Sequence, residues 1–211
     1  MGRTIPDLLE RPARSTCAPR QSKKINKKIV DMETQGTIPG PGVIRFERRL
    51  RCSLPEAWAW ITESDKRGQW LATGEMELIE GGSVSLHFRH NDLSPLPGTA
   101  PDKYKDLANG HSFTGTILRI NPPHLLSFTW EGGSEVTFEL TGLSDVVLLT
   151  LTHRGLPSDI ESQASVLAGW HAHLEIFMAA LQGQIPPNFW TLHSRLEQEY
   201  AAAPVIVVNK P

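Results

Sequence analysis

A tryptophan followed by two histidines forms the densest group of chemically capable residues, in the segment VLAGWHAHLEIFMAAL (166–181). Imidazole groups change protonation near neutral pH and can act as acids, bases or ligands. On a helix, residues two apart point about 200° apart around the axis, so His171 and His173 cannot bind one ligand. Trp170 belongs to an apolar stripe, while His171 is expected to face solvent beside Glu175 and His173 to lie at the boundary. We interpret this segment as the wall of a cavity.

His153 is the stronger candidate for a polar contact with a ligand. It has the same strand parity as Val147, Leu149 and Leu151, whose apolar character marks the face that points inward. A histidine there can orient a carbonyl or hydroxyl group of a ligand. The alternative is a histidine that hydrogen-bonds the backbone at the end of its strand.

A third group, HFRHND (87–92), contains residue types that bind metals. Alternation along a continued strand would place His87 and His90 on opposite faces, which argues against a shared metal. The sequence shows no carboxylate pair, Ser-His-Asp order, phosphate-binding glycine loop or G-x-S-x-G motif. We therefore predict no catalytic residue, no metal and no cofactor.

These residues must be positioned by an α+β domain, because short alternating segments come first and a long amphipathic segment follows. A capping box at Ser53 opens a helix that runs through Ile61, and a second short helix starts at Ser64. The predicted strands are 43–50, 75–80, 83–90, 112–120, 125–130, 135–141 and 146–153. The long helix follows from Ile160, with an apolar stripe made of Leu167, Trp170, Leu174, Phe177 and Leu181.

The ends and loops complete this organisation. Residues 1–31 hold eight Lys and Arg against three Asp and Glu, and their low apolar content predicts a disordered leader. A Gly/Pro linker, 37–42, ends this region (1–42), and Met32 is an alternative start of the chain. One domain is expected over 43–203, with 188–203 as a helical extension. The polar, proline-containing segment 91–110 is predicted to be a mobile flap near a cavity mouth.

The bulk composition limits the class of protein. With 39% hydrophobic and 21% charged residues, the chain has the composition of an ordinary globular protein. The residues after 31 hold 13 basic and 20 acidic side chains, which argues against nucleic acid as a partner. No apolar run approaches the roughly 18 residues of a membrane span, so no membrane partner is predicted. Two cysteines form no disulfide framework, and a cytoplasmic location is expected.

An ordered set of segments resembles the SRPBCC (START-like, helix-grip) superfamily. Within it, the similarity is greatest to the activator of heat-shock-protein-ninety ATPase homologue-like domain. The segments are RFERRL (45–50), PEAWAWITESDKRGQWL (55–71), the Gly81-Gly82 pair, FTGTILRINPPHLLSFTW (113–130), SEVTFELT (134–141), LTLTH (149–153) and AGWHAHLEIF (168–177). The resemblance implies a seven-stranded antiparallel sheet curved around a long C-terminal helix, with two short helices after the first strand.

The resemblance leaves the function open, because one fold serves many functions. The first hypothesis is a non-catalytic protein that holds a small apolar or aromatic ligand between the sheet and the long helix. The alternatives are a chaperone-associated module, which the family name implies, and an enzyme of the cyclase or dehydratase type. The residues expected to line the cavity are Trp70, Phe88, Trp130, Phe138, Leu149, Leu151, His153, Trp170, Leu174 and Phe177.

Overall fold

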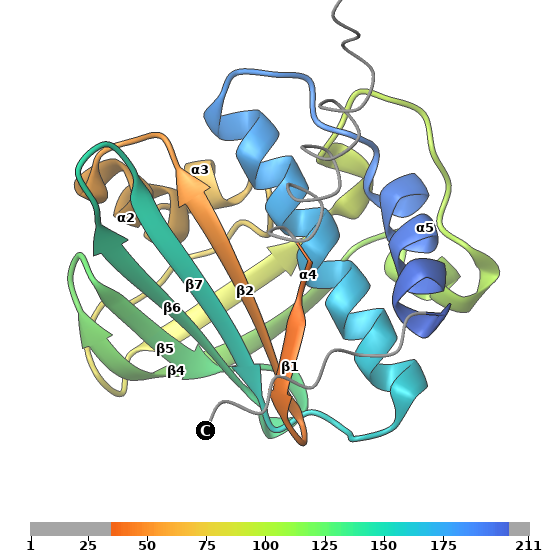
Figure 1. Ribbon diagram of the computed structural model, residues 1–211, viewed down its shortest axis with the longest axis horizontal. Coiled ribbons are helices and arrows are strands. Elements are labelled where there is room, and N and C mark those ends of the chain that lie inside the picture. Colours follow the sequence, from red (N-terminus) through yellow and green to blue (C-terminus); the bar gives the residue numbers. More distant parts are fainter. Residues whose placement is uncertain (1–34, 203–211) are drawn as a thin grey trace, which may run out of the picture. The chain divides into compact units, whose positions relative to one another are not determined.

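The computed structural model describes residues 35–202, and Figure 1 shows a curved sheet with a long helix lying against it. The predicted leader and the alternative start at Met32 lie outside the described residues. Seven antiparallel strands form one sheet in the order β1-β2-β7-β6-β5-β4-β3. The strands are β1 (Thr37–Gly40), β2 (Val43–Leu50), β3 (Ser83–Phe88), β4 (His111–Asn121), β5 (Leu125–Thr129), β6 (Glu135–Gly142) and β7 (Val147–Arg154). The α+β, helix-grip prediction is confirmed.

The first strand was not predicted. Thr37–Gly40 was expected to belong to a linker, but it pairs with β2 in a hairpin whose turn includes Gly42, at φ 66°. Pro39 is tolerated because β1 is the edge strand of the sheet. Ile38 is buried in the core, so this short segment contributes to the hydrophobic interior. The linker prediction is therefore wrong for Thr37–Gly40.

The predicted strand over 75–80 is also wrong. Only isolated bridges, Thr73 with His87 and Met76 with Val84, join this part of the chain to β3. The amide of Ile79 donates to the carbonyl of Glu77, and that of Gly82 donates to the carbonyl of Ile79. These bonds turn the chain on itself, which interrupts a continuous ladder.

Two short helices, α2 (Leu54–Thr62) and α3 (Ser64–Arg67), follow β2 as expected. The Ser53 hydroxyl caps α2 by accepting a hydrogen bond from the amide of Glu56. Arg67 is buried and its guanidinium donates to backbone carbonyls of α2 and of the segment after α3, among them those of Thr62 and Ala72. Because Trp70 lies between these anchors, Arg67 fixes the segment that carries it.

The long helix α4 (Ile160–Leu181) packs against β2, and α5 (Phe189–Ala202) lies alongside α4 (Figure 1). Asp159 caps α4 by accepting a hydrogen bond from the amide of Ser162. By length and composition α4 could cross a membrane, but much of it is buried inside the domain. It is therefore placed as a core helix.

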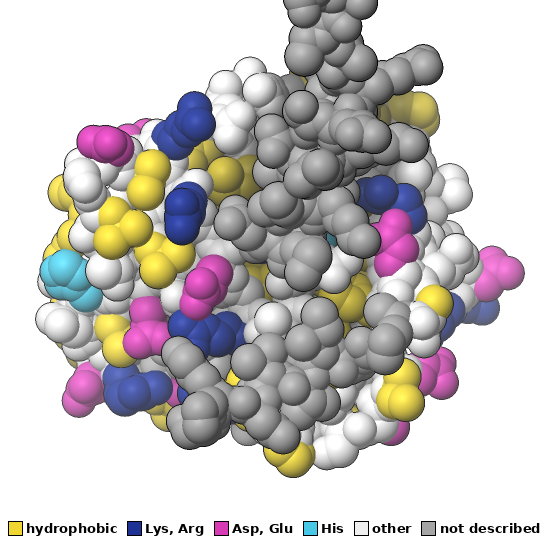
Figure 2. Space-filling view, viewed as in Figure 1, with side chains coloured by type: hydrophobic (Ala, Val, Ile, Leu, Met, Phe, Trp, Pro, Cys, Tyr) yellow, Lys and Arg dark blue, Asp and Glu magenta, His cyan; other side chains and the backbone are white. Residues whose placement is uncertain are grey.

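The segment between β3 and β4 contains two 3-10 helices, η1 (His90–Asp92) and η2 (Asp102–Leu107), and a third, η3 (Glu131–Gly133), joins β5 to β6. The Ser94 hydroxyl donates to the carbonyl of Pro186, and the Asn188 amide donates to the carbonyl of Leu96. These bonds attach the predicted flap to the start of α5. Its mobility stays a prediction. On the face seen in Figure 2, basic and acidic side chains are interspersed over the described surface.

Candidate ligand-binding cavity

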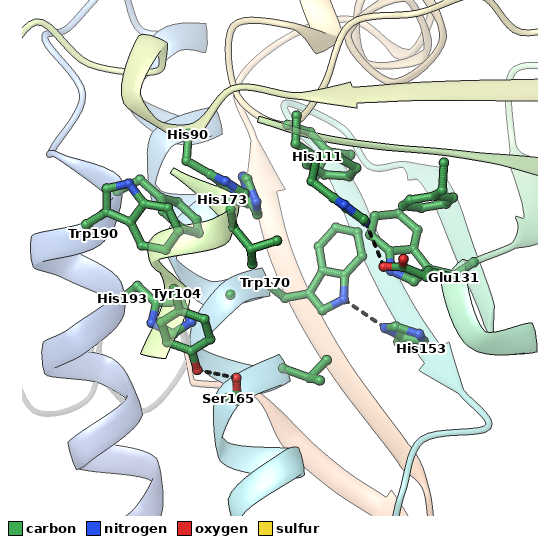
Figure 3. A pocket seen from close by; sticks show the side chains of 18 residues that line it. His90, Tyr104, His111, Glu131, His153, Ser165, Trp170, His173, Trp190 and His193 are labelled. Carbon is green, nitrogen blue, oxygen red and sulfur yellow. Dashed lines mark hydrogen bonds and ion pairs between the residues drawn. The ribbon is translucent and has the colours of Figure 1, made fainter. Parts of the chain in front are cut away.

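A cavity of about 240 Å³ lies where α4, α5, the η1–η2 segment and the sheet meet (Figure 3). Aromatic rings form most of its wall: Phe88 from β3, Phe113 from β4, Trp130 after β5, Trp170 from α4, and Phe189 and Trp190 from α5. Rings pack at 5.0 Å between Trp130 and Trp170, and at 5.7 Å between Phe88 and Trp130. The wall is therefore apolar and built from several elements.

Four of the ten residues predicted to line a cavity do line this one: Phe88, Trp130, His153 and Trp170. The other six are buried in the core outside it: Trp70, Phe138, Leu149, Leu151, Leu174 and Phe177. Phe177 stacks on Trp70 with ring centroids 4.6 Å apart, and Trp70 meets Phe138 edge to face at 6.3 Å. At this end, Trp70 therefore packs between α4 and the sheet, and these side chains belong to the core.

His153 lies on the cavity wall, but both of its ring nitrogens are used within the protein. The indole N–H of Trp170 donates to Nδ1 at 3.0 Å, so Nε2 carries the hydrogen and donates to the hydroxyl of Ser134 at 2.8 Å. Burial lowers the pKa of His153 to about 4, which keeps the ring neutral. His153 therefore positions Trp170. The sequence suggested either a contact with a ligand or a hydrogen bond to the backbone, but both partners of His153 are side chains of the protein.

The two histidines of α4 are both buried. The prediction that His171 faces solvent is wrong, because α5 covers it and its Nδ1 is 2.8 Å from the Tyr200 hydroxyl. His173 lines the cavity, and its Nδ1 donates to the carbonyl of Trp70 at 2.7 Å. Burial lowers the pKa of His173 well below its usual value.

Besides His111 at the cavity edge, two further histidines at the cavity were not predicted, His90 from η1 and His193 from α5. In each, Nδ1 is buried without a hydrogen-bond partner. Burial lowers the pKa of His90 to about 4 and also lowers that of His193. His90 continues the inward parity of Phe88, and this was the sequence signal that could have found it. In the described residues, no three His, Cys, Asp or Glu side chains form a metal-binding group.

Partly exposed polar residues lie at the edge of the cavity (Figure 3). His111 and Glu131 line it and pair at 2.9 Å between Nε2 and a carboxylate oxygen. On another side, the Tyr104 hydroxyl of η2 hydrogen-bonds Ser165 of α4 and Glu197 of α5. Tyr104 thus connects the η2 segment to both helices.

The sequence pattern of the family described as Activator of Hsp90 ATPase homolog 1-like protein matches residues 51–182. The chain belongs to this family. The solved structure of a protein from Bordetella parapertussis is similar to this chain, with 37% sequence identity and a TM-score of 0.67. The match covers 82% of this chain and 91% of that one.

Two more distant structures share the fold of this family member. CalU16 from Micromonospora echinospora is 24% identical with a TM-score of 0.54, over 76% of this chain and 86% of that one. An AHSA1-like protein from Aeromonas hydrophila is 21% identical with a TM-score of 0.52, over 67% and 92%. A search of curated proteins found no match.

The electrostatics of the cavity in this family member are those of a neutral site. Glu131 is the one acidic residue that lines it, and the described lining includes neither lysine nor arginine. The histidines whose pKa is lowered by burial stay neutral at neutral pH. The described wall is therefore largely aromatic and carries little charge.

Proposed function

We propose that this protein is a non-catalytic binding protein that holds a small, uncharged aromatic molecule in the cavity between the sheet and helices α4 and α5. The observation that carries the proposal is a space of about 240 Å³ walled by aromatic rings. Protein interiors otherwise have few voids larger than a water molecule. A dry apolar cavity of roughly 150 Å³ is enough to bind benzene. This space therefore suits a molecule of one or two rings.

Gly169 offers a direct test of this proposal. It lies on the cavity wall in α4, and a Cβ atom added there would meet nothing within 4 Å. Gly169→Leu therefore places a side chain in the open space without backbone strain. Replacing glycine inside a helix also favours folding by up to about 1 kcal/mol.

The experiment measures binding of naphthalene by calorimetry or by quenching of tryptophan fluorescence. We expect the wild type and Gly142→Leu to bind, and Gly169→Leu to remain folded but lose binding. Gly142 is a matched control, because a Cβ there also meets nothing within 4 Å and the residue lies at the end of β6, outside the cavity. Absence of binding to the wild type, or unchanged binding to Gly169→Leu, would refute the proposal.

The paired His111 and Glu131 favour a second candidate function, proton transfer to or from a bound molecule. A carboxylate that holds an imidazole at 2.9 Å is an arrangement suited to general acid–base chemistry. Native mass spectrometry of the purified protein can identify a bound molecule, which is then incubated with the wild type and with Glu131→Gln. A product formed by the wild type alone would establish an enzyme that uses Glu131, and ring closure or loss of water in that product would make it a cyclase or dehydratase; return of the unchanged molecule supports binding alone.

A further inference from the structure

We infer that the guest carries a hydroxyl group, as in a phenol, and that this hydroxyl lies between His173 and His90. The inference rests on the proposed function and names the chemical class that the same cavity selects. Both histidines line the cavity and are at least nine-tenths buried, with 6% and 9% of their surface exposed. Their ring centroids are 5.3 Å apart, and no hydrogen bond joins the two rings in the described structure.

The hydrogen bond of His173 fixes which of its nitrogens faces a ligand as an acceptor. Its Nδ1 is 2.7 Å from the carbonyl oxygen of Trp70, and a carbonyl can only accept, so Nδ1 carries the hydrogen. Because burial keeps the ring neutral, Nε2 has a lone pair and no hydrogen. No described side chain or backbone group hydrogen-bonds to Nε2. Nε2 of His173 is therefore available to accept a hydrogen bond from the guest.

His90 supplies the complementary group. Its ring is held by stacking on Phe189 at 4.2 Å and on Phe88 at 5.8 Å, and its Nδ1 is buried without a hydrogen-bond partner in the described structure. A neutral imidazole has one N–H donor and one acceptor nitrogen. A hydroxyl group satisfies both histidines, because its O–H donates to His173 while its oxygen accepts the N–H of His90.

Other polar groups fit this pair less well. A carboxylate or phosphate offers no hydrogen to His173 and finds no lysine or arginine on the described wall. An ammonium group would be a donor, but the nearest acidic partner on the wall, Glu131, is already paired with His111 at the cavity edge. An uncharged O–H group attached to an aromatic ring matches both the histidines and the rings around them.

The test compares 2-naphthol with naphthalene, two guests that differ only in a hydroxyl. We expect the wild type to bind 2-naphthol roughly tenfold more tightly at neutral pH, since one buried hydrogen bond to a group otherwise unpaired has about this effect. His173→Asn should remove the preference, because the asparagine amide can still donate to Trp70 but lacks the Nε2 acceptor. His90→Phe should reduce it and keeps the inference testable if His173→Asn fails to fold.

His87→Asn is the matched control, since His87 is exposed on β3 and bonds Ser112 outside the cavity. Its preference for 2-naphthol should equal that of the wild type. Equal affinity of the wild type for both guests, or a preference that survives both cavity substitutions, would overturn the inference and leave the proposed binding function standing. Failure of the wild type to bind either guest would overturn both.

Discussion

Two consecutive parts of α4 face the interior of the domain, but one lines the cavity and the other packs in the hydrophobic core. In residues 165–173, the side that lines the cavity carries Ser165, Val166, Gly169, Trp170 and His173. Two turns after Gly169 and Trp170, Ile176 and Phe177 point in nearly the same direction, and both are fully buried. We call residues 165–173 the cavity segment and residues 174–177 the core segment.

The difference shows what makes a cavity along a continuous helix. The core segment presents large hydrocarbon side chains, and Phe177 fills its space by stacking on Trp70 and contacting Trp60 at 5.7 Å. The cavity segment carries Val166 and Trp170, but also a glycine, a serine and a histidine, which leave space and offer polar atoms. The space therefore lies beside the part of the helix in which small and polar residues interrupt the large apolar side chains.

The largest expected effect comes from breaking the core segment. Phe177→Ala should lower the free energy of unfolding by about 3–5 kcal/mol, because Phe177 is enclosed by neighbours on all sides. Phe88→Ala, the same truncation on the cavity wall, should cost distinctly less, since Phe88 borders the open space and has fewer partner atoms on that side. Urea denaturation of both variants measures the difference. Equal losses would mean that the cavity wall is as tightly packed as the core segment.

Lowering the pH should destabilise the cavity side of the domain, where the neutral histidines lie. His90 and His153 have a pKa of about 4 in the folded protein against an ordinary value of 6.5. A histidine whose pKa is depressed in the folded protein binds more protons when the protein is unfolded. Its contribution to the free energy of unfolding is therefore present above pH 6.5 and is lost as the pH falls toward 4. At about pH 5, each of these two histidines should lower the free energy of unfolding by roughly 2 kcal/mol.

Carboxylates such as Glu175 and Glu197 also have a lowered pKa and lose stability in the same direction, at lower pH. The contribution of one histidine is therefore isolated by His90→Phe. Its loss of unfolding free energy between neutral pH and about pH 5 should be smaller than that of the wild type by roughly 2 kcal/mol. The exposed His87→Asn should follow the wild type, and identical pH profiles for all three proteins would contradict the assignment of a neutral buried His90.

The sequence was informative where the periodicity of apolar side chains determines which face of a strand or helix is buried. Alternation placed His153 inward on β7, and helical spacing placed Trp170 on the buried side of α4. The same stripe also contains Phe177, which packs closely. Periodicity tells which side of an element is buried, but it does not tell whether the opposing surface reaches it. That depends on the curvature of the sheet and on the size of the facing side chains.

The rest of the cavity comes from segments whose position no local pattern determines. His193 and Phe189 reach the cavity because α5 docks beside α4, and His171 is covered for the same reason. Tyr104 reaches it because η2 lies across the two helices. The strand at Thr37–Gly40 was missed since Gly and Pro residues usually mark a linker, whereas an edge strand tolerates them. Each of these outcomes depends on contacts between distant parts of the chain.

The smallest expected effect concerns the link between the cavity segment and the η2 segment. Tyr104→Phe removes the hydroxyl that bonds Ser165 and Glu197, while the ring keeps its contacts with Trp190 and His193. One such hydrogen bond contributes about 1 kcal/mol, so overall stability should change little. The η2 segment should open more often, giving faster tryptic cleavage at Lys103 or Lys105 and faster dissociation of a bound guest.

Tyr200→Phe is the matched control, because Tyr200 is the second of the two tyrosines and serves the opposite side of α4. Its hydroxyl accepts the amide hydrogen of Gly36 and bonds His171, away from the cavity. We expect this substitution to lower stability by a similar amount without changing cleavage at the η2 segment or guest dissociation. If both substitutions accelerate cleavage equally, the loss of a tyrosine hydroxyl increases cleavage by lowering the overall stability of the domain. If Tyr104→Phe alone does so, the η2 segment closes the cavity through its bond to the cavity segment, and the core segment has no part in it.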